Sequence, residues 1–321
     1  MHSLFVRHIV LTAATLLSFA ASAQEFPTKP IRIVVPFAPG ASVDFTGRLY
    51  GRALQDMVHQ PVIIENRGGA GTLVGTRAVK DAPADGYTLM ITTNSVVVNA
   101  VGLKPTVYRM SDFATLTGVG TAPFALLAHS SVPAKTLAEV IRYANQNPDK
   151  LNFGSLGDGG LTRLLAERFK SAAGIKVVDV PYKGGAPLLQ ALVAGEIQLC
   201  MQGVSAVIPQ LKTGTIRAYA LTAQKRTTSL PDIPTFAESG MPTLIGGVWY
   251  AAYARAETPR EVLQNLRKWM QEISVAANVR DALQKVNIDP WAGTFDEFQA
   301  FASRDEELVA KDIERFGLGT P

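Results

Sequence analysis

A loop of small residues, prolines and one carboxylate is the segment of this chain best suited to hold a ligand. Residues 36–44 read PFAPGASVD and stand between a β-branched run and a segment of helical periodicity. Backbone N–H groups at the start of a helix have no partner within the helix, so they can bind an anionic oxygen. Gly40 and Ala41 permit close approach, and Ser42 adds a hydroxyl. A purely structural turn explains the segment equally well, and Asp44 fits a helix N-cap better than a ligand contact.

Three further polar turns follow predicted strands. They are Thr-Asn-Ser at 93–95, Ser-Leu-Gly-Asp-Gly-Gly at 155–160, and Tyr-Lys-Gly-Gly at 182–185. Strands that alternate with helices form parallel sheets, and ligands of such sheets bind at the carboxyl ends of the strands. Because all these turns fall at those ends, we expect them to contribute to one binding site.

The elements that must position the turns alternate along the chain. Hydrophobic periodicity predicts strands at 31–35, 62–64, 87–92, 124–128, 151–154, 177–180, 197–201, 216–222 and 248–254. It predicts helices at 44–57, 72–80, 137–146, 161–173, 206–212, 259–276, 279–285 and 294–316, and one that ends near 193. Trp249 and Tyr250 in the last strand either line the site or pack in the core.

The element order predicts an α/β protein of two lobes. One run of strands and helices precedes residue 123 and a second follows it. The strand at 248–254 has only helices after it, which is a poor third domain, so we expect it to return to the first run. Residues 24–123 with 248–321 then form lobe 1 and residues 124–247 form lobe 2, with a hinge where the chain crosses twice.

The first 23 residues have the order of a secretory signal peptide. Arg7 is followed by an apolar run at 9–21 and by Ala-Ser-Ala, so cleavage is expected before Gln24. The run is shorter than the roughly 20 residues of a membrane-spanning helix. We therefore expect an exported protein that works in the periplasm.

The composition argues against nucleic-acid binding, an internal disulfide and a metal site. The formal charge of +4 suits anionic ligands but is too small and scattered for nucleic acid. The single cysteine, Cys200, lies in an apolar run, so no internal disulfide forms and a small buried hydrophobe is the simplest interpretation. The chain has no HExxH motif and no paired Cys/His spacing. We expect neither a metal nor a cofactor.

Seven motifs, in order along the chain, resemble the Bug-type periplasmic solute receptors, which belong with the substrate-binding subunits of tripartite tricarboxylate transporters. The motifs are KPIRIVVPFAPG at 29–40, VIIENR at 62–67, GAG at 69–71, DGYTL at 85–89, VPYKGG at 180–185, AQKR at 223–226 and LPDIPT at 230–235. The resemblance implies a type II-like periplasmic binding protein fold, with two lobes, a hinge and a ligand cleft between them. It also implies a receptor without a catalytic centre. Such a receptor captures a small carboxylate for a membrane transporter or a sensor protein, and we expect a monomer.

The resemblance carries the family's ligand contacts onto particular positions. They are Phe37, Ala38, Ala41, Ser42 and Asp44 in the first loop, Thr93, Asn94 and Ser95 in the second, and Ser155, Gly157, Thr162, Tyr182 and Gln202 from the second lobe. The chain departs from the family pattern at three positions. Val43 replaces a common hydroxyl residue, Arg163 stands where a His is frequent, and Gln202 where an Asp is common. Arg163 is either a carboxylate contact or a helix-surface residue.

A secreted hydrolase or transferase is the alternative function. Its basis is Gly154-Ser155-Leu156-Gly157, which is similar to a nucleophile elbow, although Phe153 stands where that motif needs glycine. After the signal peptide only His59 and His129 remain, and neither lies in the context of a catalytic base. The receptor is therefore the favoured interpretation.

Overall fold

The structure is a computed structural model that describes residues 26–103, 105–148, 150–156, 161–182, 184–223, 225–227, 229–244 and 246–318. The expected signal peptide and Gly157 lie outside the described residues.

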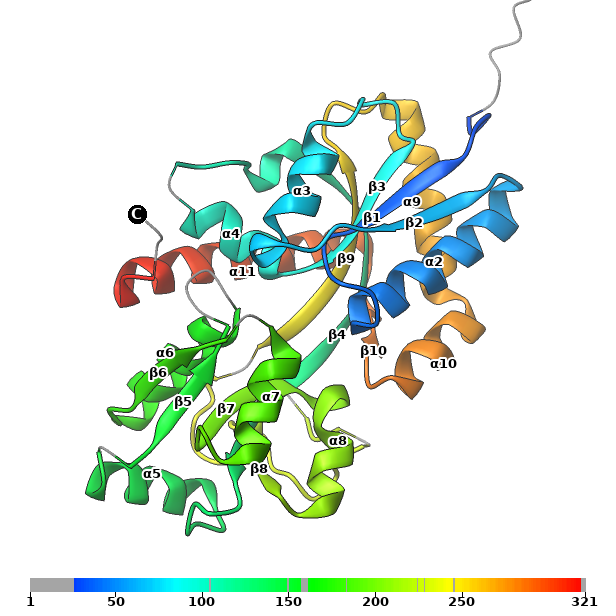
Figure 1. Cartoon of the computed structure of the whole chain (residues 1–321). Helices are drawn as coiled ribbons and strands as arrows, with labels where there is room; N and C mark the ends of the chain where they lie inside the picture. Colours follow the sequence, from blue (N-terminus) through cyan, green and yellow to red (C-terminus); the bar gives the residue numbers. More distant parts are fainter. Residues whose placement is uncertain are drawn as a thin grey trace, which may run out of the picture.

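A single mixed sheet runs through the described part of the chain (Figure 1). Its strand order is β2-β1-β3-β9-β4-β7-β5-β6, and β8 and β10 also pair with β4. The strands are β1 (Ile31–Val35), β2 (Val62–Asn66), β3 (Thr88–Thr93), β4 (Phe113–His129), β5 (Asn152–Ser155), β6 (Val178–Pro181), β7 (Leu199–Gly203), β8 (Ile216–Leu221), β9 (Gly247–Arg255) and β10 (Asp289–Pro290).

Helices cover both faces of this sheet. They are α2 (Ser42–Val58), α3 (Leu73–Lys80), α4 (Ser95–Gly102), α5 (Leu137–Gln146), α6 (Leu161–Ala173), α7 (Gly185–Ala194), α8 (Val204–Thr213), α9 (Arg260–Val275), α10 (Ala277–Lys285) and α11 (Phe295–Phe316). Two short 3₁₀ turns, η2 (Ala70–Thr72) and η3 (Met110–Asp112), complete the connections. The predicted α/β class is confirmed.

The prediction of parallel pairing is right for only part of the sheet. Strands β1, β2 and β3 pair in parallel, as do β5, β6 and β7. In contrast, β9 pairs antiparallel with β3 and β4, and β4 pairs antiparallel with β7 and β8. These strands run antiparallel because β4 and β9 carry the chain between the two halves of the molecule in opposite directions.

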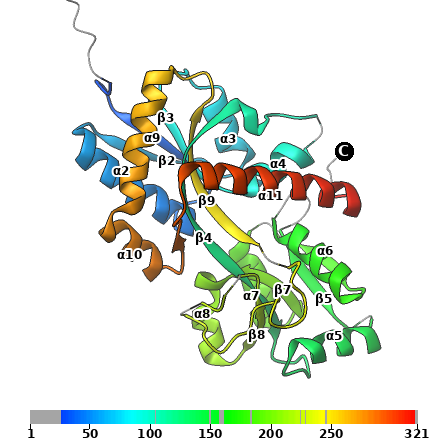
Figure 2. The ribbon, with the colours of Figure 1, turned by 180° about the vertical axis from the view of Figure 1, so that it is seen from behind.

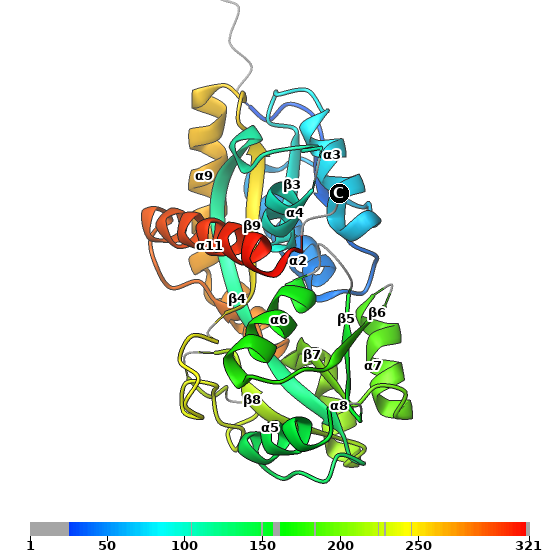
Figure 3. The ribbon, with the colours of Figure 1, turned by 90° about the vertical axis from the view of Figure 1, so that its left-hand side faces the viewer.

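Strand β4 belongs to both halves. Its first part pairs with β9 as far as the Pro123–Gly247 pair, and from Phe124 onward it pairs with β7 and β8. Figure 3 shows β4 and β9 side by side in the upper half, with β4 continuing into the lower half. Gly118 is required in the first part, because a Cβ there would lie 2.3 Å from the ring of Phe298 on α11.

Alternation along the strands assigns each face its own helices. In the upper half, Ile31 and Ile33 point into a core that includes α2, α9 and α10, whereas Val34 and Met90 point toward α3, α4 and α11 (Figure 2). In the lower half, Cys200 packs in a cluster that includes α7 and α8, and the opposite face packs against α5 and α6.

Helix α6 of the lower half also contacts α11 of the upper half, and buried residues of both helices belong to the same hydrophobic cluster (Figure 3). Arg168 Nε donates to Asp312 Oδ2 at 2.5 Å, and Arg315 donates to the Ser171 hydroxyl at 3.0 Å. The two halves therefore touch through a helix pair as well as through the shared strands.

Burial predicts that the Cys200 thiol is unreactive. The side chain is 0% exposed and loss of hydration raises the pKa of its thiol. A thiol reagent added at neutral pH should leave the folded protein unlabelled over the time in which it labels the guanidinium-unfolded chain at one site. Stoichiometric labelling of the folded protein at the same rate would contradict the placement of this residue.

Candidate functional site

The loop after β1 lies at the end of the upper half that faces the lower half (Figure 1). Ala38 is exposed, and Phe37, Ala41 and Ser42 are partly exposed. Helix α2 begins at Ser42 with Ala41 as its N-cap, and no side chain caps it. The exposed first turn of α2 can therefore offer backbone N–H groups and the positive end of the helix dipole to an anion.

Asp44 is not the N-cap that the sequence predicted, because the helix starts two residues earlier. It sits in the first turn, and its carboxylate accepts from Gly40 N at 2.9 Å, Asn66 Nδ2 at 3.0 Å and Arg48 Nε at 3.2 Å. Asn66 Nδ2 also donates to the Phe37 carbonyl at 3.2 Å. Asp44 is 5% exposed, so it fixes the loop from beneath.

These contacts also set the ionisation of Asp44. Burial raises its pKa, but the hydrogen bonds from Gly40, Asn66 and Arg48 outweigh burial, and the net shift is downward. The carboxylate is therefore ionised at neutral pH, and Arg48 is its ion-pair partner at 3.1 Å.

Ser42 is linked to the strand that returns from the second half. Its Oγ shares a hydrogen bond of 2.8 Å with the hydroxyl of Tyr250 on β9. Tyr250 is 2% exposed, and burial raises the pKa of its hydroxyl to about 12. Trp249, the neighbouring candidate, belongs to the core: it packs edge-on against Phe298, and its Nε1 donates to Asp305 at 2.8 Å.

The predicted turn at 93–95 is instead the junction of β3 and α4. Thr93 ends the strand, Asn94 is the N-cap, and Ser95 begins the helix. Asn94 is 2% exposed, and its Nδ2 donates to the carbonyl of Gly247 at 2.9 Å. Its Oδ1 is buried without a hydrogen-bond partner among the described residues. Asn94 thus ties this loop to the point where β9 enters the upper half.

The second-lobe candidates gather at the carboxyl ends of β5, β6 and β7. Ser155 is 0% exposed and its Oγ donates to Asp179 Oδ2 at 2.9 Å. Thr162 Oγ1 accepts from Leu156 N at 2.9 Å, and Tyr182 N donates to the Ser155 carbonyl at 2.8 Å. Tyr182 is partly exposed, whereas Ser155 and Thr162 face inward.

Gln202 and Arg163, two departures from the family pattern, are both engaged within the second lobe. Gln202 Nε2 donates to the Gly185 carbonyl at 2.8 Å, at the start of α7. Arg163 pairs with Asp179 and also with Glu167, at 3.0 Å. Arg163 is therefore neither an isolated surface residue nor a cation without a partner. The sequence analysis gave no role to Asp179, because one acid in an otherwise apolar strand has no diagnostic pattern.

Among the described residues, the two histidines stand on other elements than Ser155. Its hydroxyl donates to a carboxylate, whereas His59 ends α2 and His129 Nδ1 lies 2.8 Å from the Ser131 hydroxyl. Within the described ranges, no three His, Cys, Asp or Glu side chains are grouped so that they could hold a metal ion.

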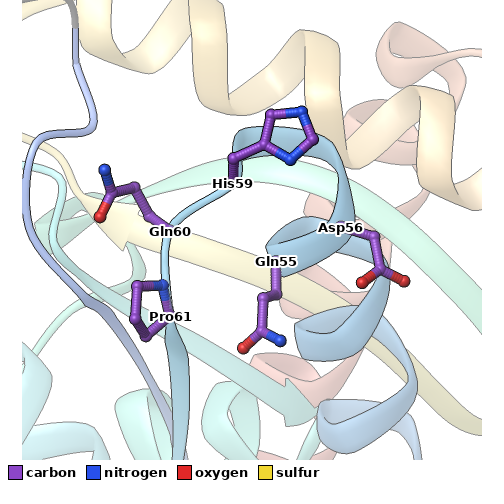
Figure 4. Close-up of a pocket in the computed structure, with 5 residues that line it drawn as sticks. All are labelled: Gln55, Asp56, His59, Gln60 and Pro61. Carbon is purple, nitrogen blue, oxygen red and sulfur yellow. The ribbon is translucent and has the colours of Figure 1, made fainter.

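A surface hollow of about 500 Å³ lies at the end of α2 that is remote from the loop at 36–41 (Figure 4). Gln55, Asp56, His59, Gln60 and Pro61 line it. Gln55, the first residue of α2 that lines the hollow, stands 13 positions after Ser42, which corresponds to about 20 Å along the helix axis. This hollow is not part of the loop cluster described above.

Comparison with solved structures defines the class of the fold. The structure of Rpa4515 from R. palustris with adipate covers 92% of this chain and 99% of its own, with a TM-score of 0.83 and 29% identity. MatC (Rpa3494) from Rhodopseudomonas palustris with bound malate covers 90% of this chain and 98% of its own, with a TM-score of 0.75 and 29% identity. The chain therefore has the two-lobed α/β fold of solute-binding proteins.

The family follows from the sequence comparisons. Residues 47–318 match the family described as tripartite tricarboxylate transporter family receptor, and this chain belongs to it. Protein BugT of Bordetella pertussis is 31% identical over 92% of this chain and 89% of its own length. The resemblance noted in the sequence is thus confirmed. In the part of the chain that the structure describes, no helix is long and apolar enough to cross a membrane.

The Asp44 contacts predict a pH-dependent loss of stability in Asp44→Asn. The native carboxylate has a lowered pKa, so its contribution is present above its ordinary value of 3.8 and is lost as pH falls through the lower folded value. At pH 7 the substitution should lower the free energy of unfolding by about 1.5 to 3 kcal/mol, the range for hydrogen bonds to a charged group. Urea unfolding at a series of pH values measures this.

Asp56→Asn is the matched control, because Asp56 is exposed on the same helix. It should change the free energy of unfolding by less than about 0.5 kcal/mol. A loss in Asp44→Asn that stayed constant down to pH 2 would show that the charge of Asp44 does not stabilise the loop.

Proposed function

We propose that this protein captures a small carboxylate-bearing organic anion between its two lobes. The observation that carries the proposal is the agreement of its fold with Rpa4515 with adipate and MatC with bound malate, each over at least 90% of the chain. The first turn of α2 supplies the chemistry, because an uncapped helix start exposed beside a fixed loop favours an oxyanion.

The proposed site draws on both lobes. Phe37, Ala38, Ala41 and Ser42 meet the carboxylate from the first lobe, with Asp44 beneath them and Thr93, Asn94 and Ser95 beside them. Tyr182 faces the ligand from the second lobe, and Ser155, Gly157, Thr162 and Gln202 shape the loops around it. Ordered water can complete such a site, since water-mediated hydrogen bonds are nearly as favourable as direct ones.

Ligand binding is coupled to closure of the lobes. We place lobe 1 at 24–123 with 248–321 and lobe 2 at 124–247, because the partner of β4 changes between Pro123 and Phe124. The ligand contacts both lobes only when they close, so binding shifts the population toward the closed form.

The proposal also covers the location of the protein in the cell and the partner that receives the ligand. The chain is exported with cleavage before Gln24, acts in the periplasm as a monomer, and delivers its ligand unchanged to a tripartite transporter or a sensor protein. Family membership supports the transporter as partner. We assign no reaction step to Ser155, whose Oγ donates to the Asp179 carboxylate.

A panel of mono-, di- and tricarboxylates, including adipate and malate, tests the proposal by thermal shift. At least one acid should raise the Tm in proportion to the logarithm of its concentration, and chromatography should recover it chemically unchanged. Turnover of the acid, or no shift with any member of the panel, would overturn the proposed function.

Two substitutions test the site itself. Ser42→Trp fills the space before α2 and Tyr182→Ala removes the exposed ring of the second lobe, so each should weaken binding at least about tenfold by titration calorimetry. Ser303→Trp on the exposed face of α11 and Tyr143→Ala on α5 are matched controls that should bind like the unmodified protein. Unchanged affinity in both site variants would contradict the assignment.

A further inference from the structure

A buried ion pair lies beneath the second-lobe loops. Arg163 on α6 and Asp179 on β6 are in contact, and their side chains are only 23% and 7% exposed. Taking both charges out of water costs free energy that their attraction need not recover, so a buried pair is weak support for stability alone. The position of the Arg163–Asp179 pair in the second lobe says more about its role than its contribution to stability does.

One oxygen of Asp179 joins three elements at the edge of the candidate site. Asp179 stands opposite Phe153 in the β5–β6 register, so its side chain lies on the same face as Ser155, toward α6. Its Oδ2 accepts from Ser155 Oγ at 2.9 Å and also contacts Arg163. The end of β5, the strand β6 and the start of α6 therefore meet at this atom.

Arg163 connects the pair to the far end of the same loop. It directly follows Thr162, whose Oγ1 accepts from Leu156 N at 2.9 Å. Its NH2 group lies 3.0 Å from Glu167 Oε1, which also pairs with Lys170 Nζ at 2.6 Å. Two cations and two carboxylates, three of them on α6 and Asp179 on β6, are thus linked with no net charge.

The pair also leaves polar atoms unsatisfied. Arg163 Nε and Asp179 Oδ1 are both buried without a hydrogen-bond partner among the described residues. Each such atom lowers stability, because a buried donor or acceptor loses its water without replacement.

We propose that Arg163 and Asp179 form a positioning pair that sets the ligand affinity of the second lobe. The pair holds Ser155, at the end of β5, and Thr162, in the first turn of α6, at a fixed separation. It acts through these residues and does not itself bind the ligand anion, because Asp179 and Glu167 already engage the Arg163 guanidinium. This inference rests on the proposed function and adds the pair that determines the shape of the second-lobe half of the site.

The double variant Arg163→Met/Asp179→Leu of the full chain distinguishes a positioning role from a stabilising role, because ligand affinity and Tm are measured separately. The two substitutions remove two buried charges, which favours the folded state, and also an acceptor of Ser155, which opposes it, so the Tm should change little. Affinity for the acids of the panel that the unmodified protein binds, adipate and malate first, should fall about tenfold or more, the usual effect of losing a supporting contact. Calorimetry gives the affinity and a thermal scan gives the Tm.

A second ion pair provides the control. Lys80 and Asp112, 3.0 Å apart, are 34% and 30% exposed and lie in the first lobe away from these loops. Lys80→Met/Asp112→Leu should leave the affinity unchanged whatever its Tm. In Asp179→Asn, which keeps an acceptor for Ser155 but leaves Arg163 without a carboxylate on β6, the Tm should fall.

The outcomes are distinguishable from failure of the proposed function. An unmodified protein that binds no acid of the panel overturns the proposed function and this inference together. A binding-competent protein whose Arg163→Met/Asp179→Leu variant keeps both its Tm and its affinity overturns the positioning role alone. If that variant loses stability, Arg163→Lys, which keeps the charge opposite Asp179, must restore affinity at least partly, and failure to do so also overturns the role.

Discussion

The antiparallel pairing of β4 with β9 is the constraint on which the rest of the structure depends. These strands are the sheet's connection between the two halves, and their pairing register ends at Pro123 and Gly247, where β4 changes partners. Two side chains of the first-lobe site are tied to β9: Ser42 through the Tyr250 hydroxyl and Asn94 through the Gly247 carbonyl. A change in the position of β9 at this crossing would therefore move Ser42 and Asn94, which belong to the loops that we assign to the ligand.

The two halves of the site are stabilised in different ways. The first-lobe loop is held by a carboxylate, Asp44, that is well supplied with donors and has a lowered pKa. In the second lobe, Asp179 accepts from Ser155 and contacts Arg163, and its second oxygen has no hydrogen-bond partner among the described residues. The first loop is therefore fixed by several hydrogen-bond donors, whereas the second half depends on an ion pair whose burial costs free energy.

Much of the fold could be predicted from the sequence, and the failures have physical reasons. Helices α5 and α6 were predicted at their observed bounds, because apolar spacing and clear start and stop signals agree there. The first part of β4, residues 113–123, was missed, since it is rich in Thr and Gly and is buried by tertiary packing rather than marked by an apolar pattern. Helix α4 was missed because its run of three valines favours a strand locally, and burial against α11 and Tyr108 overrides that preference.

The order of strands and helices along the chain was enough to predict which loops form the candidate site, but not how their side chains are oriented. Parallel strands place their carboxyl ends together, so the loops after β1 and β5 could be expected to hold ligand contacts. Whether a side chain faces outward or inward depends on register. Ser155 faces Asp179 and is fully buried, and no pattern around residue 155 indicates that.

The place of β9 in the sheet has a consequence for how the protein is made. Because β9 lies between β3 and β4, the sheet of the upper half lacks a middle strand until residue 255 has been synthesised. The lower half, by contrast, has all of its strands once β8 ends at Leu221. An emerging chain can thus complete the strands of its second half before those of its first, and the sheet of the upper half stays incomplete until nearly four-fifths of the protein exists.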